Sequence, residues 1–101
     1  MSDVELDPVI HAQSRLRVMA TLAALPEGDH LTFTKLQQLL DMTAGNLSTH
    51  LRKLEDARYV AVKKTFEGRS PVTYVALSKQ GRRAFETYTE SLEALLRGKS
   101  T

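Results

Sequence analysis

Cysteine is absent from the 101 residues of this chain. Its absence excludes disulfides, thiolate metal sites and cysteine nucleophiles, and it fits a reducing compartment, so we expect a cytoplasmic protein. Long apolar runs are lacking as well, and no segment has the roughly 18 apolar residues of a membrane span. The opening residues, MSDVELDP, are acidic and carry no hydrophobic signal region, so we expect no export.

The signatures of common enzymes are also missing. The sequence contains no nucleophile elbow, no phosphate-binding loop and no set of residues at metal-ligand spacing. His11, His30 and His50 are dispersed, and the neighbouring carboxylates Glu55 and Asp56 fit an exposed pair at a helix end. We therefore predict that the chain is not an enzyme and that it holds no metal and no cofactor.

The composition describes one small globular domain, residues 1–101. A hydrophobic content of 42% suffices for one modest core, and 26% charged residues is ordinary for a soluble protein. A chain of this length buries limited apolar surface, so pairing with a second copy would add to its stability.

The net charge of +2 is unevenly distributed along the chain. Residues 1–31 hold two basic and five acidic side chains, a net charge of −3, whereas residues 43–72 hold six basic and three acidic ones, a net charge of +3. A basic segment suits a phosphate-bearing partner. A randomly charged surface would explain the charge alone equally well.

Three helices are predicted in the first half of the chain. They cover residues 8 or 13 to 25, 35 to 40, and 44 to about 57. Thr32 or Thr34 can cap the second helix, and Thr43 can cap the third after a turn at Asp41 and Met42. The first helix has a wide apolar face, which indicates contacts beyond its own core. The core positions expected on the other two are Leu36, Leu39, Leu40, Leu47, Leu51 and Leu54.

The second half of the chain predicts a hairpin and a last helix. Residues 60–65 and 72–77 are rich in Val, Thr and Tyr, and Glu67 to Ser70 supply the turn. Residues 30–33 could add a short strand. Ser78 can cap a final helix that ends near residue 97. The predicted class is mainly α with a small β-hairpin (α+β), in the order of a winged helix-turn-helix.

Several segments resemble one family of regulators. Thr43–Val60, TAGNLSTHLRKLEDARYV, resembles the recognition helix of MarR/ArsR-type winged-helix regulators. Glu67–Tyr74 and Leu77–Arg82 resemble the wing and the opening of the last helix in their compact stand-alone subgroup. Asp7–His11 and Arg15–Val18 resemble the start of that subgroup. Together the matches cover nearly the whole chain.

The resemblance implies a homodimeric transcriptional regulator that binds double-stranded DNA. It also implies dimerisation through the first and last helices, residues 8–25 and 78–97, while residues 31–77 form the helix-turn-helix and wing. The residues expected at the dimer interface are Ile10, Leu16, Met19, Phe85, Tyr88, Leu92 and Leu95. Metal sensing of the ArsR type does not fit a chain that lacks cysteine.

The predicted DNA-binding residues lie on the third helix, opposite its leucines, and on the hairpin. They are Thr43, Ala44, Gly45, Asn46, Ser48, Thr49, His50, Arg52, Lys53, Lys63, Arg69 and Thr73. Small residues let the helix approach base pairs, Asn46 can read an adenine, and Arg52 can pair with guanine or phosphate. Lys63 and Lys64 point to opposite faces of their strand, so they cannot share one role.

Three functions remain open from the sequence. The first is a sequence-specific DNA-binding regulator, a homodimeric repressor with the third helix in the major groove and the wing at the minor groove. The second is a ligand-responsive regulator with a small-molecule pocket between the dimer helices. The third is a winged-helix module that binds protein and not DNA.

Overall fold

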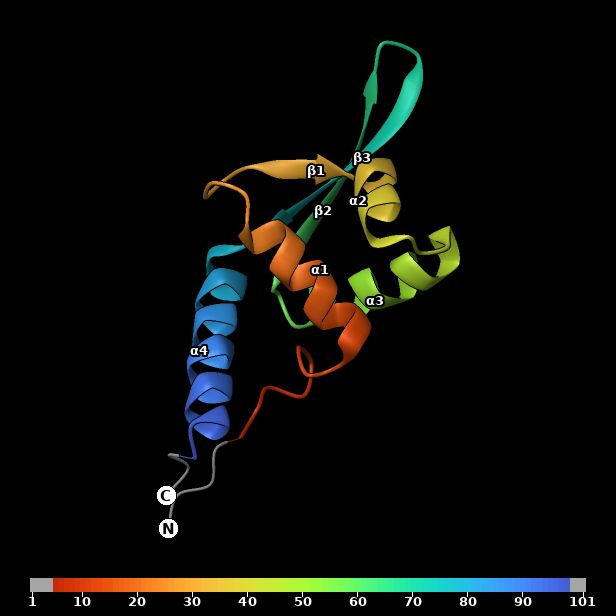
Figure 1. Ribbon diagram of the computed structural model, residues 1–101. Helices are drawn as coiled ribbons and strands as arrows, with labels where there is room; N and C mark the ends of the chain where they lie inside the picture. Colours follow the sequence, from red (N-terminus) through yellow and green to blue (C-terminus); the bar gives the residue numbers. More distant parts are fainter. Residues whose placement is uncertain (1–4, 99–101) are drawn as a thin grey trace.

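The computed structural model describes residues 5–98 and confirms the predicted α+β class (Figure 1). Four helices accompany a three-stranded sheet, and the short extra strand is present. The elements are α1 (Gln13–Ala23), β1 (His30–Thr32), α2 (Phe33–Leu40), α3 (Ala44–Asp56), β2 (Val60–Glu67), β3 (Ser70–Leu77) and α4 (Lys79–Leu96). The predicted domain limits, residues 1 and 101, lie outside the described residues. Within residues 5–98, no helix has the length and apolarity to cross a membrane.

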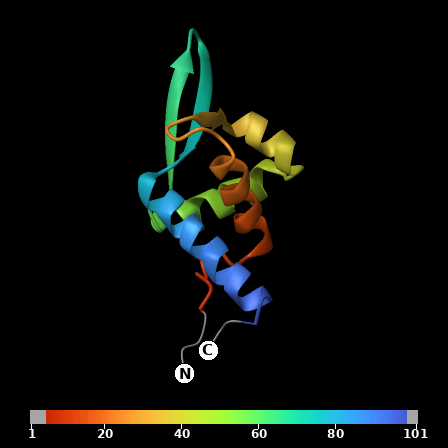
Figure 2. The same ribbon diagram turned by 60° about the vertical axis from the view of Figure 1, so that its left-hand side comes forward.

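The sheet is antiparallel, with β3 between β1 and β2. Beyond β1, the strands β2 and β3 continue as a hairpin, the wing (residues 60–77), which projects from the helical body (Figures 1 and 2). Pairing continues to Glu67 and Ser70, so the strands are longer than predicted and only Gly68 and Arg69 remain in the turn. Gly68 has φ +63°, a conformation that glycine adopts without a Cβ penalty.

Three helices begin at the hydroxyl caps that the sequence predicts. Each cap oxygen accepts a hydrogen bond from the backbone N–H three residues later. The pairs are Thr32 with Lys35 (3.1 Å), Thr43 with Asn46 (3.1 Å) and Ser78 with Gly81 (2.9 Å). Because Thr32 and not Thr34 caps α2, this helix begins at Phe33, two residues earlier than predicted.

One hydrophobic core joins all the helices and the sheet. The helix α1 lies at its centre and contacts α2, α3, α4 and β3. The buried members are Ile10, Val18, Met19, Leu22, Leu36, Leu40, Leu47, Leu51, Leu54, Val60, Val75, Leu77 and Tyr88. Val18, Met19 and Leu22 of the wide apolar face of α1 are therefore buried within the chain, whereas Leu16 and Ala23 remain half-buried.

This core corrects several predicted positions. Ile10 and Met19 are 0% exposed and Tyr88 is 2% exposed, so these three belong to the chain's own core and have no free surface for a dimer interface. The sequence predicts Leu39 in the core, but this side chain is 51% exposed, because Leu36 and Leu40 at i and i+4 already form the inner side of the short helix α2.

The segment before α1 packs against the body through polar contacts. The Tyr59 hydroxyl donates to the Asp7 carboxylate, whose other oxygen accepts from the Val9 N–H at 2.9 Å. This hydrogen bond, with burial and the Asp7 charge, raises the pKa of Tyr59 to about 12. His11 Nδ1 lies 2.9 Å from the Tyr88 hydroxyl. Residues 8–10 form a turn held by these contacts, and α1 begins only at Gln13.

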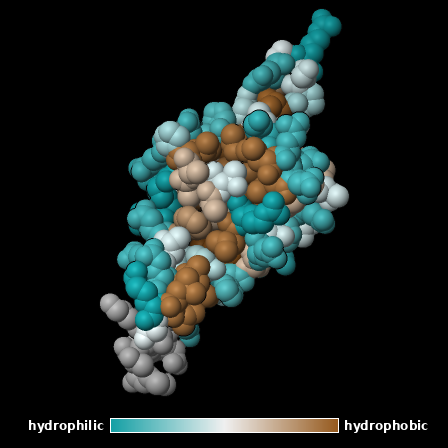
Figure 3. Space-filling view, viewed as in Figure 1, coloured by the Kyte–Doolittle hydropathy of each residue, from teal (hydrophilic) through white to brown (hydrophobic). Residues whose placement is uncertain are grey.

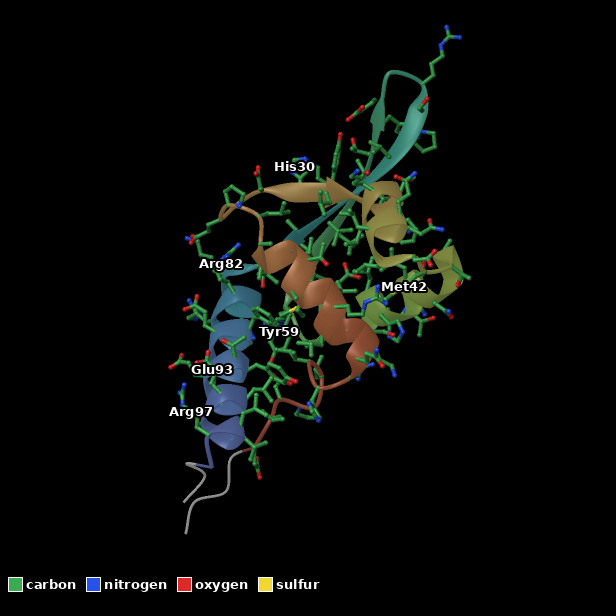
Figure 4. The ribbon with its side chains drawn as sticks, viewed as in Figure 1. His30, Met42, Tyr59, Arg82, Glu93 and Arg97 are labelled. Carbon is green, nitrogen blue, oxygen red and sulfur yellow. The ribbon has the colours of Figure 1, made fainter. Side chains whose placement is uncertain are left out.

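The end of α3 and the start of α4 interlock. Arg58 has φ +66°, and the Tyr59 N–H returns to the Leu54 carbonyl at 2.9 Å, which closes α3 with a left-handed turn. Ser78 then donates to both residues of this turn, from its N–H to the Tyr59 carbonyl at 3.0 Å and from its hydroxyl to the Arg58 carbonyl at 2.7 Å. Figure 4 shows Tyr59 beside α4. The orientation of α3 is thus tied to that of α4.

Candidate nucleic-acid interface

The outer face of α3 is polar and exposed, as the sequence predicts. Leu47, Leu51 and Leu54 point into the core and turn the intervening positions outward. The predicted residues on this exposed face are Thr43, Ala44, Gly45, Asn46, Ser48, Thr49, Arg52 and Lys53. We call this surface the reading face.

Small and polar groups gather at the first turn of the reading face. A Cβ added at Gly45 would meet no atom within 4 Å, so the helix end is open to an approaching partner. The Thr43 hydroxyl is used as the cap, and the Thr49 hydroxyl donates to the Gly45 carbonyl at 3.0 Å. The Thr43 hydroxyl accepts as the cap and keeps its own proton to donate, whereas the Thr49 proton is already used.

The turn between α2 and α3 fixes the angle of the reading face. Asp41 closes α2 in the left-handed region, with φ 52°. The Arg17 guanidinium of α1 donates to the Leu40 carbonyl at 2.7 Å, which satisfies one of the free carbonyls at the end of α2. This hydrogen bond ties the end of α2, and with it the turn before α3, to α1.

The wing has two faces, and the register of its two strands determines which lysine lies on the face toward α3. Lys64 pairs with Thr73, on the same face of the hairpin as the core pairs Val60–Leu77 and Val62–Val75. Lys63 pairs with Tyr74 and so lies on the opposite face. We call the face that carries Lys64 and Thr73 the groove face.

A groove of about 360 Å³ separates the groove face from α3. Its walls include Ser48 and Arg52 from α3, and Lys64 and Thr73 from the wing. Two cations and two hydroxyls therefore converge on one concave surface, together with the carboxylate of Glu55. Lys63 does not line this groove, so Lys64 is the wing lysine that faces α3. The alternation after the apolar Val60 and Val62 already pointed to Lys64.

Arg69 occupies the tip of the wing and is exposed, at the end of the hairpin farthest from the core. The reading face, the groove and this tip follow one another along the molecule. Of the predicted residues, Ser48, Arg52 and Thr73 line this groove, whereas Lys53 faces the segment before α1, beside Arg15.

His50 behaves differently from its neighbours on α3. It is half-buried, and its Nδ1 atom is buried without a hydrogen-bond partner among the described residues. Burial, and then the charges of Arg15 and Lys53, lower the pKa of His50. A lowered pKa favours the neutral imidazole of His50 over its charged form.

The other histidines have structural surroundings. His11 contacts Tyr88, and the His30 ring meets the Tyr74 ring edge-on, with centroids 4.5 Å apart. Within residues 5–98, no three His, Asp or Glu side chains are grouped so that they could hold a metal ion.

Comparisons with known proteins identify the same architecture. Residues 14–96 match the family described as "Winged helix DNA-binding domain". An uncharacterised protein of Methanocaldococcus jannaschii is 31% identical over 80 residues, which are 79% of this chain and 84% of that protein. A solved transcriptional regulator homologue from Pyrococcus horikoshii OT3 has a TM-score of 0.81 at 29% identity, covering 92% of this chain and 89% of its own.

A more distant match shows the fold alone. The S. aureus MepR protein, solved in complex with DNA, has a TM-score of 0.67 at 18% identity and covers 95% of this chain and 72% of its own. The names of the matched family and of the two solved proteins refer to DNA binding or transcriptional regulation, and not to catalysis.

Proposed function

The chain belongs to the winged-helix DNA-binding domain family, which confirms the resemblance found in its sequence, and on this premise we propose that it is a homodimeric transcriptional regulator that binds double-stranded DNA. The observation that carries the proposal is the groove in which Arg52 of α3 and Lys64 of the wing converge beside an exposed polar helix face. The Pyrococcus relative, described as a transcriptional regulator homologue, supports the same function.

The docking that we propose follows from this geometry. The reading face enters the major groove, with Gly45 and Ala44 allowing close approach and Asn46 facing base edges. One DNA backbone strand then passes through the groove between Arg52 and Lys64. Arg69, at the wing tip, reaches the phosphates that flank the neighbouring minor groove.

A second copy would present two reading faces to one operator. The exposed leucines at the end of α4, Leu95 (42%) and Leu96 (78%), offer apolar surface for that contact, with Phe85, Leu92 and Leu16 half-buried nearby in the core. Figure 3 shows apolar surface beside the lower end of α4. Two half-sites about 34–36 Å apart would match such a dimer. A regulator of this size acts most simply by occupying its operator, so we propose repression.

The direct test is a fluorescence titration of the protein with sheared fragments of its own genome, followed by sequencing of the bound fraction. We expect selected fragments to share a two-fold symmetric site and binding to weaken steeply as salt rises. Absence of binding even at about 50 mM salt would favour the protein-interaction module instead.

Lys64 and Lys63 form a matched pair for testing the groove. We expect Lys64→Ala to reduce the slope of log K against log salt by roughly one, because one phosphate contact is lost. Lys63→Ala, on the other face of the same strand, should leave the slope unchanged. Fluorescence anisotropy over a series of salt concentrations measures both, and equal slopes for the two variants would remove Lys64 from the interface.

Asn46 is the residue that we expect to read a base. Asn46→Ala should cost about 1–3 kcal/mol on the selected operator and much less on unrelated DNA, so that sequence preference relaxes. Competition titrations with single-base operator variants measure this. A uniform loss across all sequences would assign Asn46 to the phosphate backbone.

A ligand-responsive regulator is the second candidate, and one observation favours it. An open groove of about 690 Å³ lies between the segment before α1 and α4, and its walls include Asp7, Tyr59, Arg83 and Tyr88. NadR, 20% identical and of similar fold, was solved in complex with 4-hydroxyphenylacetate. A thermal-shift screen of small aromatic acids tests the idea, since a ligand that prefers the folded state raises the melting temperature.

A further inference from the structure

An exposed aromatic ring lies on the groove face of the wing, beyond Lys64. Phe66 is 69% exposed, although phenylalanine is among the residues most often buried. Its cross-strand partner is Pro71, which is also exposed, so both rings lie on the same face of the hairpin. They make a small apolar patch on a wing whose surface in Figure 3 is otherwise mostly hydrophilic.

The patch continues the surface that faces DNA in the proposed function. Phe66 follows Lys64 by two residues, so it lies about 7 Å farther along the groove face. Arg69 follows at the tip. The exposed carboxylate of Glu67 alternates to the opposite face of the hairpin, so the groove face itself carries Lys64 on one side of the patch and leads to Arg69 on the other. This arrangement suits a partner with apolar walls between two rows of negative charge.

The minor groove of a DNA duplex has this chemistry. Its walls are deoxyribose rings, its floor is made of base edges, and phosphates line both rims. Apolar side chains that enter it partly unstack a base step and bend the duplex. An apolar protein surface would match the Phe66 ring but not the two flanking cations.

We propose that Phe66 enters the minor groove beside each half-site and presses its ring against a deoxyribose and the neighbouring base edge. Lys64 and Arg69 hold the phosphates on either side, and Pro71 supports the ring. This inference rests on the proposed DNA-binding function. It adds a contact whose strength does not depend on salt and which favours easily unstacked steps in the flanking sequence.

The experiment compares Phe66→Thr with Val72→Thr in the full chain. Threonine keeps the strand propensity in both, and Val72 lies on the opposite face, paired with Thr65. The probe is the selected operator duplex with 2-aminopurine placed in the flanking minor-groove step, where fluorescence rises when the base unstacks. Anisotropy gives affinity and salt slope, and light scattering gives the mass of the free protein.

We expect Phe66→Thr to weaken binding by about tenfold to a hundredfold, the scale of one buried aromatic ring, with an unchanged salt slope. The rise in 2-aminopurine fluorescence should disappear with it. Val72→Thr should keep affinity and fluorescence at the level of the unchanged protein.

Other outcomes overturn the inference in distinguishable ways. If the unchanged protein binds its operator and Phe66→Thr binds equally well, the inference fails and the proposed function stands. A change in salt slope would assign the effect to displaced phosphate contacts. A change in the mass of the free protein would place the ring between two copies of this chain. Absence of DNA binding by the unchanged protein would overturn both proposals together.

Discussion

Gly81→Ala is expected to destabilise the protein by about 3 kcal/mol, at the upper end of the cost of overpacking. A Cβ on this residue would lie 2.0 Å from the Tyr59 carbonyl oxygen and 2.8 Å from its carbon. The obstacle is backbone, and that carbonyl also accepts from the Ser78 N–H, so it cannot move aside cheaply. For a domain of this size, we expect the melting temperature to fall by about 10–20 °C.

The matched control is Gly45→Ala, a substitution in the first turn of α3, where the new methyl group meets nothing within 4 Å. Alanine is the better helix former, so stability should rise by up to about 1 kcal/mol. Thermal and urea unfolding followed by circular dichroism measure both variants. Equal stability of the two variants would show that α4 can shift away from the end of α3.

The consequence of this close approach extends to DNA binding. Because Gly81, Ser78 and Tyr59 hold the first turn of α4 against the end of α3, the direction of one helix determines that of the other. In the proposed dimer, α4 meets the second copy and α3 meets the DNA. In such a dimer, the spacing between the two reading faces would depend on this junction, whose contacts are mostly to backbone atoms.

Local features of the fold were predictable from the sequence because their causes are local. Thr43 and Ser78 are followed by N–H groups within one turn, so their role as caps depends only on neighbouring residues. The two runs of strand-forming residues on either side of Gly68 are neighbours in the sequence, so their pairing was likewise predictable. These features also place most of the reading face, since Leu47 and Leu51 fix its orientation.

Features that depend on distant parts of the chain were predicted less well. The segment around Ile10 has no periodic pattern, and contacts of Asp7 and His11 with the distant Tyr59 and Tyr88 hold it while Ile10 joins the core. The sequence places Gly81 early in a helix, but it does not reveal that this residue packs against the Tyr59 carbonyl. An apolar stripe on α1 or α4 can face either the chain's own core or a second copy, and only the fold separates the two.

The second large effect is expected at the end of α4. Replacing both Leu95 and Leu96 with Glu should convert the proposed dimer into monomers, because two carboxylates would have to be buried at the apolar contact. Both side chains are substantially exposed within one chain, so the fold itself should lose little stability. Analytical ultracentrifugation measures the oligomeric state.

The same variant should lose DNA affinity through loss of avidity. A monomer holds one half-site at a time, so binding to a two-half-site operator should fall by about 100-fold or more, while binding to an isolated half-site stays unchanged. Arg97→Glu changes the net charge by the same amount and serves as the control. Arg97 lies with Glu93, 3.5 Å away, on the side of α4 away from the helical body (Figure 4). If the Arg97→Glu control loses affinity equally, charge repulsion from DNA explains the loss. If the Leu95 and Leu96 variant stays dimeric, the dimer contact lies elsewhere, and α4 serves only to fix the orientation of α3.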